Sequence, residues 1–135
     1  MKYFDANVLV HYFVNFDVEK YTESKWLVND SINNGTFYLT LLCVQETTFA
    51  MAKLQQPLAD INQAVKMMLS YNPIGYELPD INRGCELAQY LGFKNINDCL
   101  HTAMAETHDC TELITYNRKD FVRIQPLTSL TINML

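Results

Sequence analysis

Four carboxylates of this 135-residue chain stand out because of the residues around them. Asp5 ends the apolar run of "MKYF" and is followed, after Ala-Asn, by a second apolar run. Glu46 interrupts the apolar spacing of "LLCVQETTFAMAKL", and Asp98 opens the segment "DCLHTAMA". Asp120 follows the strand-like segment "TELITY" and precedes a phenylalanine. Burial of an unpaired carboxylate is costly, so acids in such surroundings need partners.

Each of these acids also has an ordinary structural explanation. Asp5 can cap the helix that follows it, and an Asp in the first turn of a helix, such as Asp98, complements the helix dipole. Glu46 can lie at the edge of its apolar stripe or pair with a lysine. Asp120, taken alone, is an ordinary loop acid. Taken one at a time, the residues leave these alternatives open. The stronger indication of a functional site is that the acids follow strands or begin helices at what would be the same edge of a sheet.

The elements that must position the acids alternate between short strands and helices. We expect strands at 2–4, 36–40, 111–116 and 129–135, with a loop between the last two. Such alternation predicts a parallel sheet with right-handed crossovers, and ligands gather at the carboxyl ends of its strands. Asp5, Thr40 and Thr115 would lie at such ends. Helices are expected at 6–13, 18–33, 42–55, 58–70, 79–91 and 98–108, the last one capped by Asn97.

Carboxylates that converge in one crevice repel each other unless a divalent cation neutralises them. Oxygen-only ligands suit Mg²⁺ or Mn²⁺. The segment "CLHTAMAETHDC" does not predict a zinc site, because a helix would place Cys99 and Cys110 on one face and His101 and His108 on a nearly opposite one.

Composition indicates one globular domain over residues 1–135. The net charge of −5 argues against nonspecific nucleic-acid binding, which usually needs a basic surface, but not against an enzyme that meets nucleic acid through metal ions. The chain shows no signal peptide and no apolar stretch of the ~20 residues that span a membrane, so we expect a cytoplasmic protein without a membrane partner. The four cysteines are expected to be buried thiols.

Four segments, in order, resemble the motifs of PIN-domain ribonucleases, specifically the VapC-type toxins of bacterial toxin–antitoxin pairs. They are "YFDANVLVHYF", "TLLCVQET", "INDCLHTAMA" and "ELITYNRKDF". The resemblance runs nearly from end to end. It implies an α/β fold, a three-layer α/β/α sandwich around a central parallel sheet of about four to five short strands.

The resemblance also implies a metal-dependent endoribonuclease that hydrolyses RNA phosphodiester bonds in line, with a water activated by Mg²⁺ or Mn²⁺. Asp5, Glu46 and Asp98 would hold the metal, and Asp120 would join them as a catalytic acid. Asn7, Thr40, Thr115 and Asn117 would orient the carboxylates or a water from behind.

Two departures from the family pattern concern residues near this site. Many relatives carry a fourth acid where this chain has Asn117, and an amide adds no charge. His101 occupies a position that is usually apolar, and we expect a partly buried structural histidine there. Arg118 and Lys119, beside the late loop, could meet the RNA backbone, although exposed basic residues in a loop are mostly just solvated.

The resemblance implies three partners: an RNA substrate, for which transfer RNA is one candidate, a small antitoxin protein and a second copy of the chain. The alternative function is a PIN-fold module that has lost catalysis and binds RNA or protein, and Asn117 is its support. Six apolar residues could contribute to partner surfaces, although their spacing is typical of a core. They are Val10, Tyr12, Phe13, Trp26, Phe49 and Met51.

Overall fold

Four short parallel strands form one sheet in the order β2-β1-β3-β4. The computed structural model describes all residues from Met1 to Leu135. Strands β1 and β3 are the central pair, with Phe4 opposite Ile114, so that their carboxyl ends lie side by side. The strands span Lys2–Phe4 (β1), Phe37–Tyr38 (β2), Glu112–Thr115 (β3) and Thr131–Met134 (β4).

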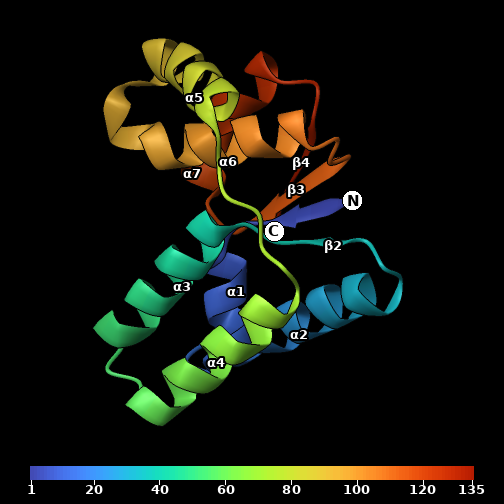
Figure 1. The fold of residues 1–135 in the computed structure, drawn as a ribbon, viewed down its shortest axis with the longest axis vertical. Helices are drawn as coiled ribbons and strands as arrows, with labels where there is room; N and C mark the ends of the chain where they lie inside the picture. Colours follow the sequence, from blue (N-terminus) through green and yellow to red (C-terminus); the bar gives the residue numbers. More distant parts are fainter.

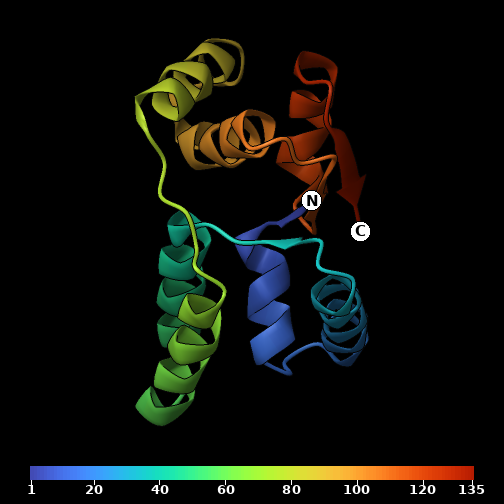
Figure 2. The ribbon, with the colours of Figure 1, turned by 45° about the vertical axis from the view of Figure 1, so that its right-hand side comes forward.

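The helices cover both faces of the sheet, as Figures 1 and 2 show. One layer holds α1 (Ala6–Phe13), α2 (Val18–Asn33), α3 (Leu41–Lys53) and α4 (Leu58–Ser70). The other holds α5 (Leu78–Leu91), α6 (Ile96–Thr107) and α7 (Arg118–Ile124), with short 3₁₀ turns at Phe93–Asn95 and Gln125–Leu127. The predicted three-layer α/β/α architecture with a parallel sheet is therefore confirmed.

The core forms around β1, the strand that carries Asp5 at its end. Tyr3 and Phe4 are fully buried, and because successive residues of a strand face opposite sides of a sheet, they pack on different layers. The ring of Tyr3 meets His101 of α6 at 5.6 Å, and that of Phe4 meets Phe37 at 5.5 Å. Packing on both faces leaves β1 little freedom, which makes its end a rigid support for a functional group.

Helix α6 begins earlier than the sequence predicts. The turn at Phe93–Asn95 runs directly into it, so the helix starts at Ile96 with Asn95 at its cap position. The prediction that Asn97 caps the helix is wrong, because Asn97 lies in the first turn and its side chain contacts Glu46 instead.

The predicted loop after β3 is also wrong, because Arg118–Ile124 forms helix α7. Its cap is Asn117, whose side-chain oxygen accepts a hydrogen bond from the backbone N–H of Asp120 at 3.4 Å. An amide at the cap and an acid three residues later are a recognisable helix start. The helix is short, at 7 residues, which is why apolar periodicity did not reveal it.

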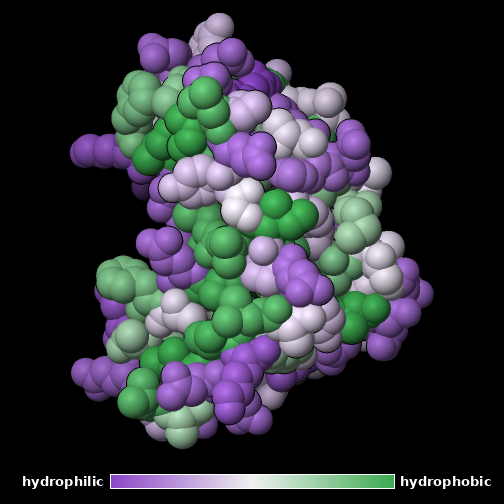
Figure 3. All heavy atoms as spheres, viewed as in Figure 1, coloured by the Kyte–Doolittle hydropathy of each residue, from purple (hydrophilic) through white to green (hydrophobic).

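The six apolar residues considered for partner surfaces divide into three groups. Val10, Tyr12 and Met51 are buried, and Phe13 is partly buried against the core. Trp26 and Phe49 are exposed, contrary to the expectation that all are core. Figure 3 shows hydrophobic side chains gathered along the middle of one face, where the segment between α4 and α5 crosses in front of the sheet. No helix has both the length and the apolar character needed to cross a membrane.

Candidate active site

Asp5 is the first residue after β1, and its side chain is not used as a helix cap. Its backbone carbonyl accepts hydrogen bonds from Val8 at 3.0 Å and Leu9 at 3.4 Å, which begins α1. The carboxylate accepts instead from two side chains, because Asn7 Nδ2 and Thr115 Oγ1 both lie 2.6 Å from Asp5 Oδ2. The backbone thus does the capping and leaves the buried carboxylate free for another role.

Asn7 and Thr115 form a bracket that fixes this carboxylate. Asn7 Nδ2 also donates to Thr115 Oγ1 at 3.1 Å, and Asn7 Oδ1 accepts from the backbone N–H of Tyr116 at 3.0 Å. Thr115 Oγ1 in turn accepts from the backbone N–H of Asn117 at 2.9 Å. The two side-chain hydrogen bonds to the carboxylate, from Asn7 and Thr115, both reach Oδ2, so Asp5 Oδ1 keeps lone pairs for a ligand.

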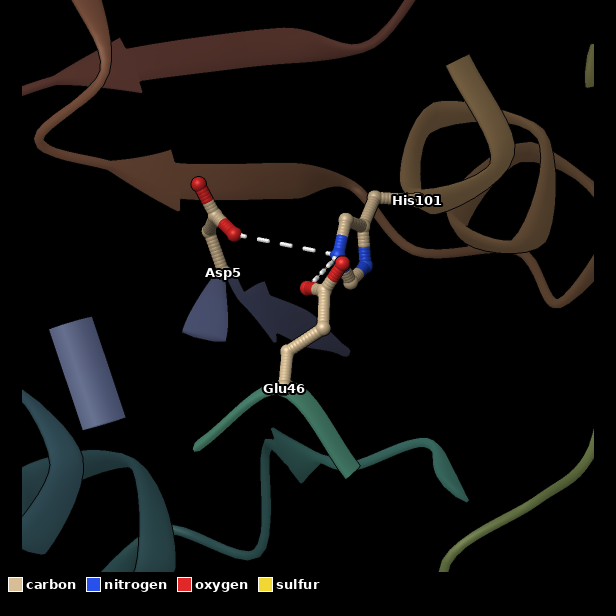
Figure 4. A group of neighbouring side chains, drawn as sticks. All are labelled: Asp5, Glu46 and His101. Carbon is tan, nitrogen blue, oxygen red and sulfur yellow. Dashed lines mark hydrogen bonds and ion pairs between the residues drawn. The ribbon is translucent and has the colours of Figure 1, made fainter. Parts of the chain in front are cut away.

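His101 of α6 lies between Asp5 and Glu46, as Figure 4 shows. Its Nε2 is 2.6 Å from Glu46 Oε2 and 3.9 Å from Asp5 Oδ1, and the ring is only 1% exposed. Glu46 Oε1 accepts a further hydrogen bond from Asn97 Nδ2 at 2.7 Å. One ligand atom from each of Asp5, Glu46 and His101 lies within 4.8 Å of the other two.

The other ring nitrogen of His101, Nδ1, also has a hydrogen-bond partner. Nδ1 lies 2.7 Å from Tyr3 Oη, which lies 3.0 Å from Thr40 Oγ1, and Thr40 accepts from the Cys43 N–H at 3.2 Å. The short contact between Nε2 and a carboxylate oxygen requires a hydrogen, which we assign to the ring nitrogen. His101 therefore donates to Glu46 and orients it, rather than offering a free lone pair. Thr40 belongs to this buried chain and contacts no carboxylate.

Burial and charge act in opposite directions on the pKa values of this group. Burial raises the pKa of Asp5, against the opposing effects of His101 and the Thr115 hydrogen bond. Burial alone would lower the pKa of His101. The charge and hydrogen bond of Cys43, the hydrogen bond to Glu46 and the charge of Asp5 all raise it. The pKa of His101 is therefore well above its usual value. A positively charged ring beside two carboxylates compensates part of their repulsion.

Asp98 and Asp120 are linked through Asn117. Asn117 Nδ2 lies 3.3 Å from Asp98 Oδ2 and 3.0 Å from Asp120 Oδ2. Burial, followed by the negative charge of Asp5, raises the pKa of Asp98 from 3.8 to about 6, and the charge of Asp120 adds to this. The residue that replaces an acid in this family thus donates to both neighbouring carboxylates.

A pocket of about 450 Å³ brings together five of the ten predicted residues. Thr115 supports Asp5 from behind, whereas Thr40 and Asp120 do not line the pocket. Arg118 and Lys119 do not line it either, and Arg118 donates to the carbonyl of Met134 at 2.9 Å. The predicted residues that line it are Asp5, Asn7, Glu46, Asp98 and Asn117.

A family model described as the PIN domain matches residues 2–125. The chain belongs to the PIN domain family. PIN domains are generally nucleases that use a divalent metal ion, and the group of Asp5, Glu46 and His101 fits metal binding. Searches of curated proteins and of solved structures found no significant match.

The donor set of this PIN domain fits a hard divalent cation. Asp5, Glu46 and Asp98 come from three separate elements and face one pocket, and carboxylate oxygens are the ligands that Mg²⁺ and Mn²⁺ prefer. The raised pKa of Asp98 has its second-largest cause in the charge of Asp5. A cation between them would relieve this repulsion.

Sequence reasoning underestimated His101 and missed Asn97, which both hold Glu46 from α6. A signal for His101 was present, since it follows Asp98 by three residues and so shares its helix face. A structural histidine was favoured instead, because this position is usually apolar in the family that the chain resembles. Asn97 was assigned to capping because the start of α6 was placed too late.

Proposed function

We propose that this PIN domain is a Mg²⁺- or Mn²⁺-dependent endoribonuclease, a VapC-type toxin that a cognate antitoxin holds inactive. The observation that carries the proposal is the convergence of Asp5, Glu46 and Asp98 on one pocket at the carboxyl edge of the sheet. These three carboxylates would hold the metal. When bound, the metal lowers the pKa of a water molecule and offsets the charge that develops on the phosphodiester.

The residues around the carboxylates supply orientation. The bracket of Asn7 and Thr115 holds Asp5 Oδ2, which directs the other oxygen toward the pocket. His101 holds Glu46 by the 2.6 Å contact. Asn117 donates to Asp98 and takes the place of the fourth acid without adding repulsion. Pre-oriented ligands lose little entropy when a metal and a phosphate arrive.

RNA binding by a chain of net charge −5 must overcome repulsion. Metal ions in the acidic pocket would reverse this charge where the phosphate binds. Arg118 and Lys119, exposed at the start of α7, are proposed as further contacts to the RNA backbone.

The proposed antitoxin and the proposed homodimer rest on the resemblance to VapC-type toxins. Exposed aromatic side chains support them, because a partner that covers Trp26 or Phe49 would remove a large apolar surface from water.

Cleavage of RNA by the purified chain, free of any antitoxin, tests the nuclease function. Total RNA and transfer RNA are incubated with Mg²⁺, Mn²⁺ or a chelator, using wild type, Asp5→Asn and Asp98→Asn. Asp60→Asn is the matched control, since Asp60 is exposed and does not line the pocket. We expect discrete fragments that disappear with the chelator and with either pocket variant. RNA binding without cleavage by the folded wild type would instead favour the inactive binding module.

A further inference from the structure

The pocket that holds the acids continues beyond them along an aromatic wall. His11 and Phe16 line this extension with the side chains of Val10, Ala50 and Leu54. The catalytic role proposed above uses none of these residues. Metal-dependent hydrolysis uses the acids and the metal that they hold. The apolar extension of the same pocket is not explained by this chemistry.

The wall is a stack of rings whose outer member is accessible. The rings of His11 and Phe16 are stacked, with centroids 4.5 Å apart and planes 20° from parallel. The inner ring, His11, is supported edge-on by Tyr116 at 5.1 Å. Phe16 is 55% exposed, so part of its surface is available to a further flat group.

His11 is a buried histidine with an unsatisfied ring nitrogen. It is 8% exposed, and its Nδ1 has no hydrogen-bond partner. A buried polar atom without a partner is rare and lowers stability, so packing alone does not account for a histidine at this position. Burial, followed by the nearby charge of Lys20, lowers the pKa of His11, so the ring stays neutral and presents an aromatic surface.

The charge at this end of the pocket differs from that at the catalytic end. Lys53, in the last turn of α3, lines the extension, whereas Asp5, Glu46 and Asp98 line the other end. A ligand that spans the pocket would thus offer a phosphate to the metal end, a flat apolar group to Phe16 and a second negative charge to Lys53. A nucleotide chain combines these three features.

We propose that the wall of His11 and Phe16 is a nucleobase-binding subsite, in which an unpaired base of the substrate stacks on Phe16 while Lys53 contacts a backbone phosphate. The subsite rests on the proposed ribonuclease function and assigns to Phe16 and Lys53 the binding of an unpaired nucleotide next to the carboxylates. A paired base within an A-form helix is stacked on both faces and cannot leave the stack without a cost, whereas an unpaired base stacks readily on an aromatic side chain.

Binding of a fluorescent oligonucleotide tests the subsite separately from cleavage. The probe is a single-stranded oligouridylate with one central 2-aminopurine, whose fluorescence is quenched when it stacks on an aromatic ring. The full chain carries Asp98→Asn as the cleavage-deficient parent, with Mg²⁺ present. Phe16→Ala and Phe16→Trp are introduced in this parent. Phe93→Ala is the matched control, because Phe93 is also 55% exposed but does not line the pocket.

We expect Phe16→Ala to abolish the quenching and to weaken binding by about 5- to 150-fold, which corresponds to the ~1–3 kcal/mol that one stacked base contributes. Phe16→Trp should retain both quenching and affinity, and Phe93→Ala should change neither. Annealing the probe to a complementary strand should weaken binding by the parent. Thermal unfolding of each variant checks that the fold is unchanged.

Parent-like quenching and affinity in Phe16→Ala would overturn the subsite and leave the ribonuclease proposal intact. Absence of both RNA binding by the parent and cleavage by the wild type would refute the proposed function, and the subsite with it.

Discussion

The metal-free protein is expected to gain stability when Asp98 is replaced by asparagine. The pKa of Asp98 is raised in the folded state to about 6, from 3.8, chiefly by burial and the charge of Asp5. The folded state therefore binds a proton that the unfolded state releases between these pH values, and the free energy of unfolding falls as the pH rises through this range. Below pH 3.8 the effect is absent, and above about pH 6 it is complete.

The magnitude follows from the pKa difference. Each pKa unit corresponds to about 1.36 kcal/mol, so roughly two units lower the free energy of unfolding by up to about 3 kcal/mol at pH 7.5. Asparagine has nearly the same shape, keeps an acceptor for Asn117 and carries no charge. The variant should recover most of this free energy, which for a chain of this size raises Tm by about 10 °C at most.

Thermal unfolding in the presence of a chelator measures this effect. Wild type, Asp98→Asn and the control Asp60→Asn are compared at pH 7.5, 6 and 4.5. The gain of Asp98→Asn should shrink as the pH falls, whereas Asp60→Asn should show no such trend. Added Mn²⁺ should raise the Tm of wild type more than that of Asp98→Asn, because metal binding stabilises the folded state. A variant less stable than wild type at pH 7.5, or a gain that does not change with pH, would refute the reasoning.

Three further substitutions probe the residues that orient the carboxylates. Thr115→Val removes a 2.6 Å donor from Asp5 and should lower the free energy of unfolding by about 1–3 kcal/mol. Urea unfolding measures it, and Thr115→Ser should behave as wild type. His101→Gln releases Glu46 from a 2.6 Å contact and should slow RNA cleavage about 10- to 100-fold, whereas an unchanged rate would exclude an orienting role. Asn117→Asp adds a charge between two carboxylates, so calorimetry should find tighter Mn²⁺ binding while Tm in chelator falls. If Mn²⁺ affinity and Tm both fall, the inference that Asn117 lies where an added charge would help hold the metal is wrong.

Local patterns were enough to predict the fold class and most elements. Helices α1, α2 and α4 have the predicted ends. For α2 and α4 local signals mark an end, since Asp17 caps α2 and Asn34-Gly35 follows it, and Pro57 precedes α4. The errors fell where local signals compete. The 3₁₀ turn before α6 shifted the start of that helix, and α7 was too short for periodicity to show.

The sequence by itself placed acids next to strand ends and helix starts, since each of those positions depends on neighbours a few residues away. Only the tertiary structure decided which of them share a pocket, because the register of β1 with β3 brings Asp5 to Thr115 across 110 positions of the chain. It also placed His101 against Glu46 and kept Thr40 away from the carboxylates. These contacts depend on the packing of three layers, and side-chain directions across layers are not determined by any local pattern.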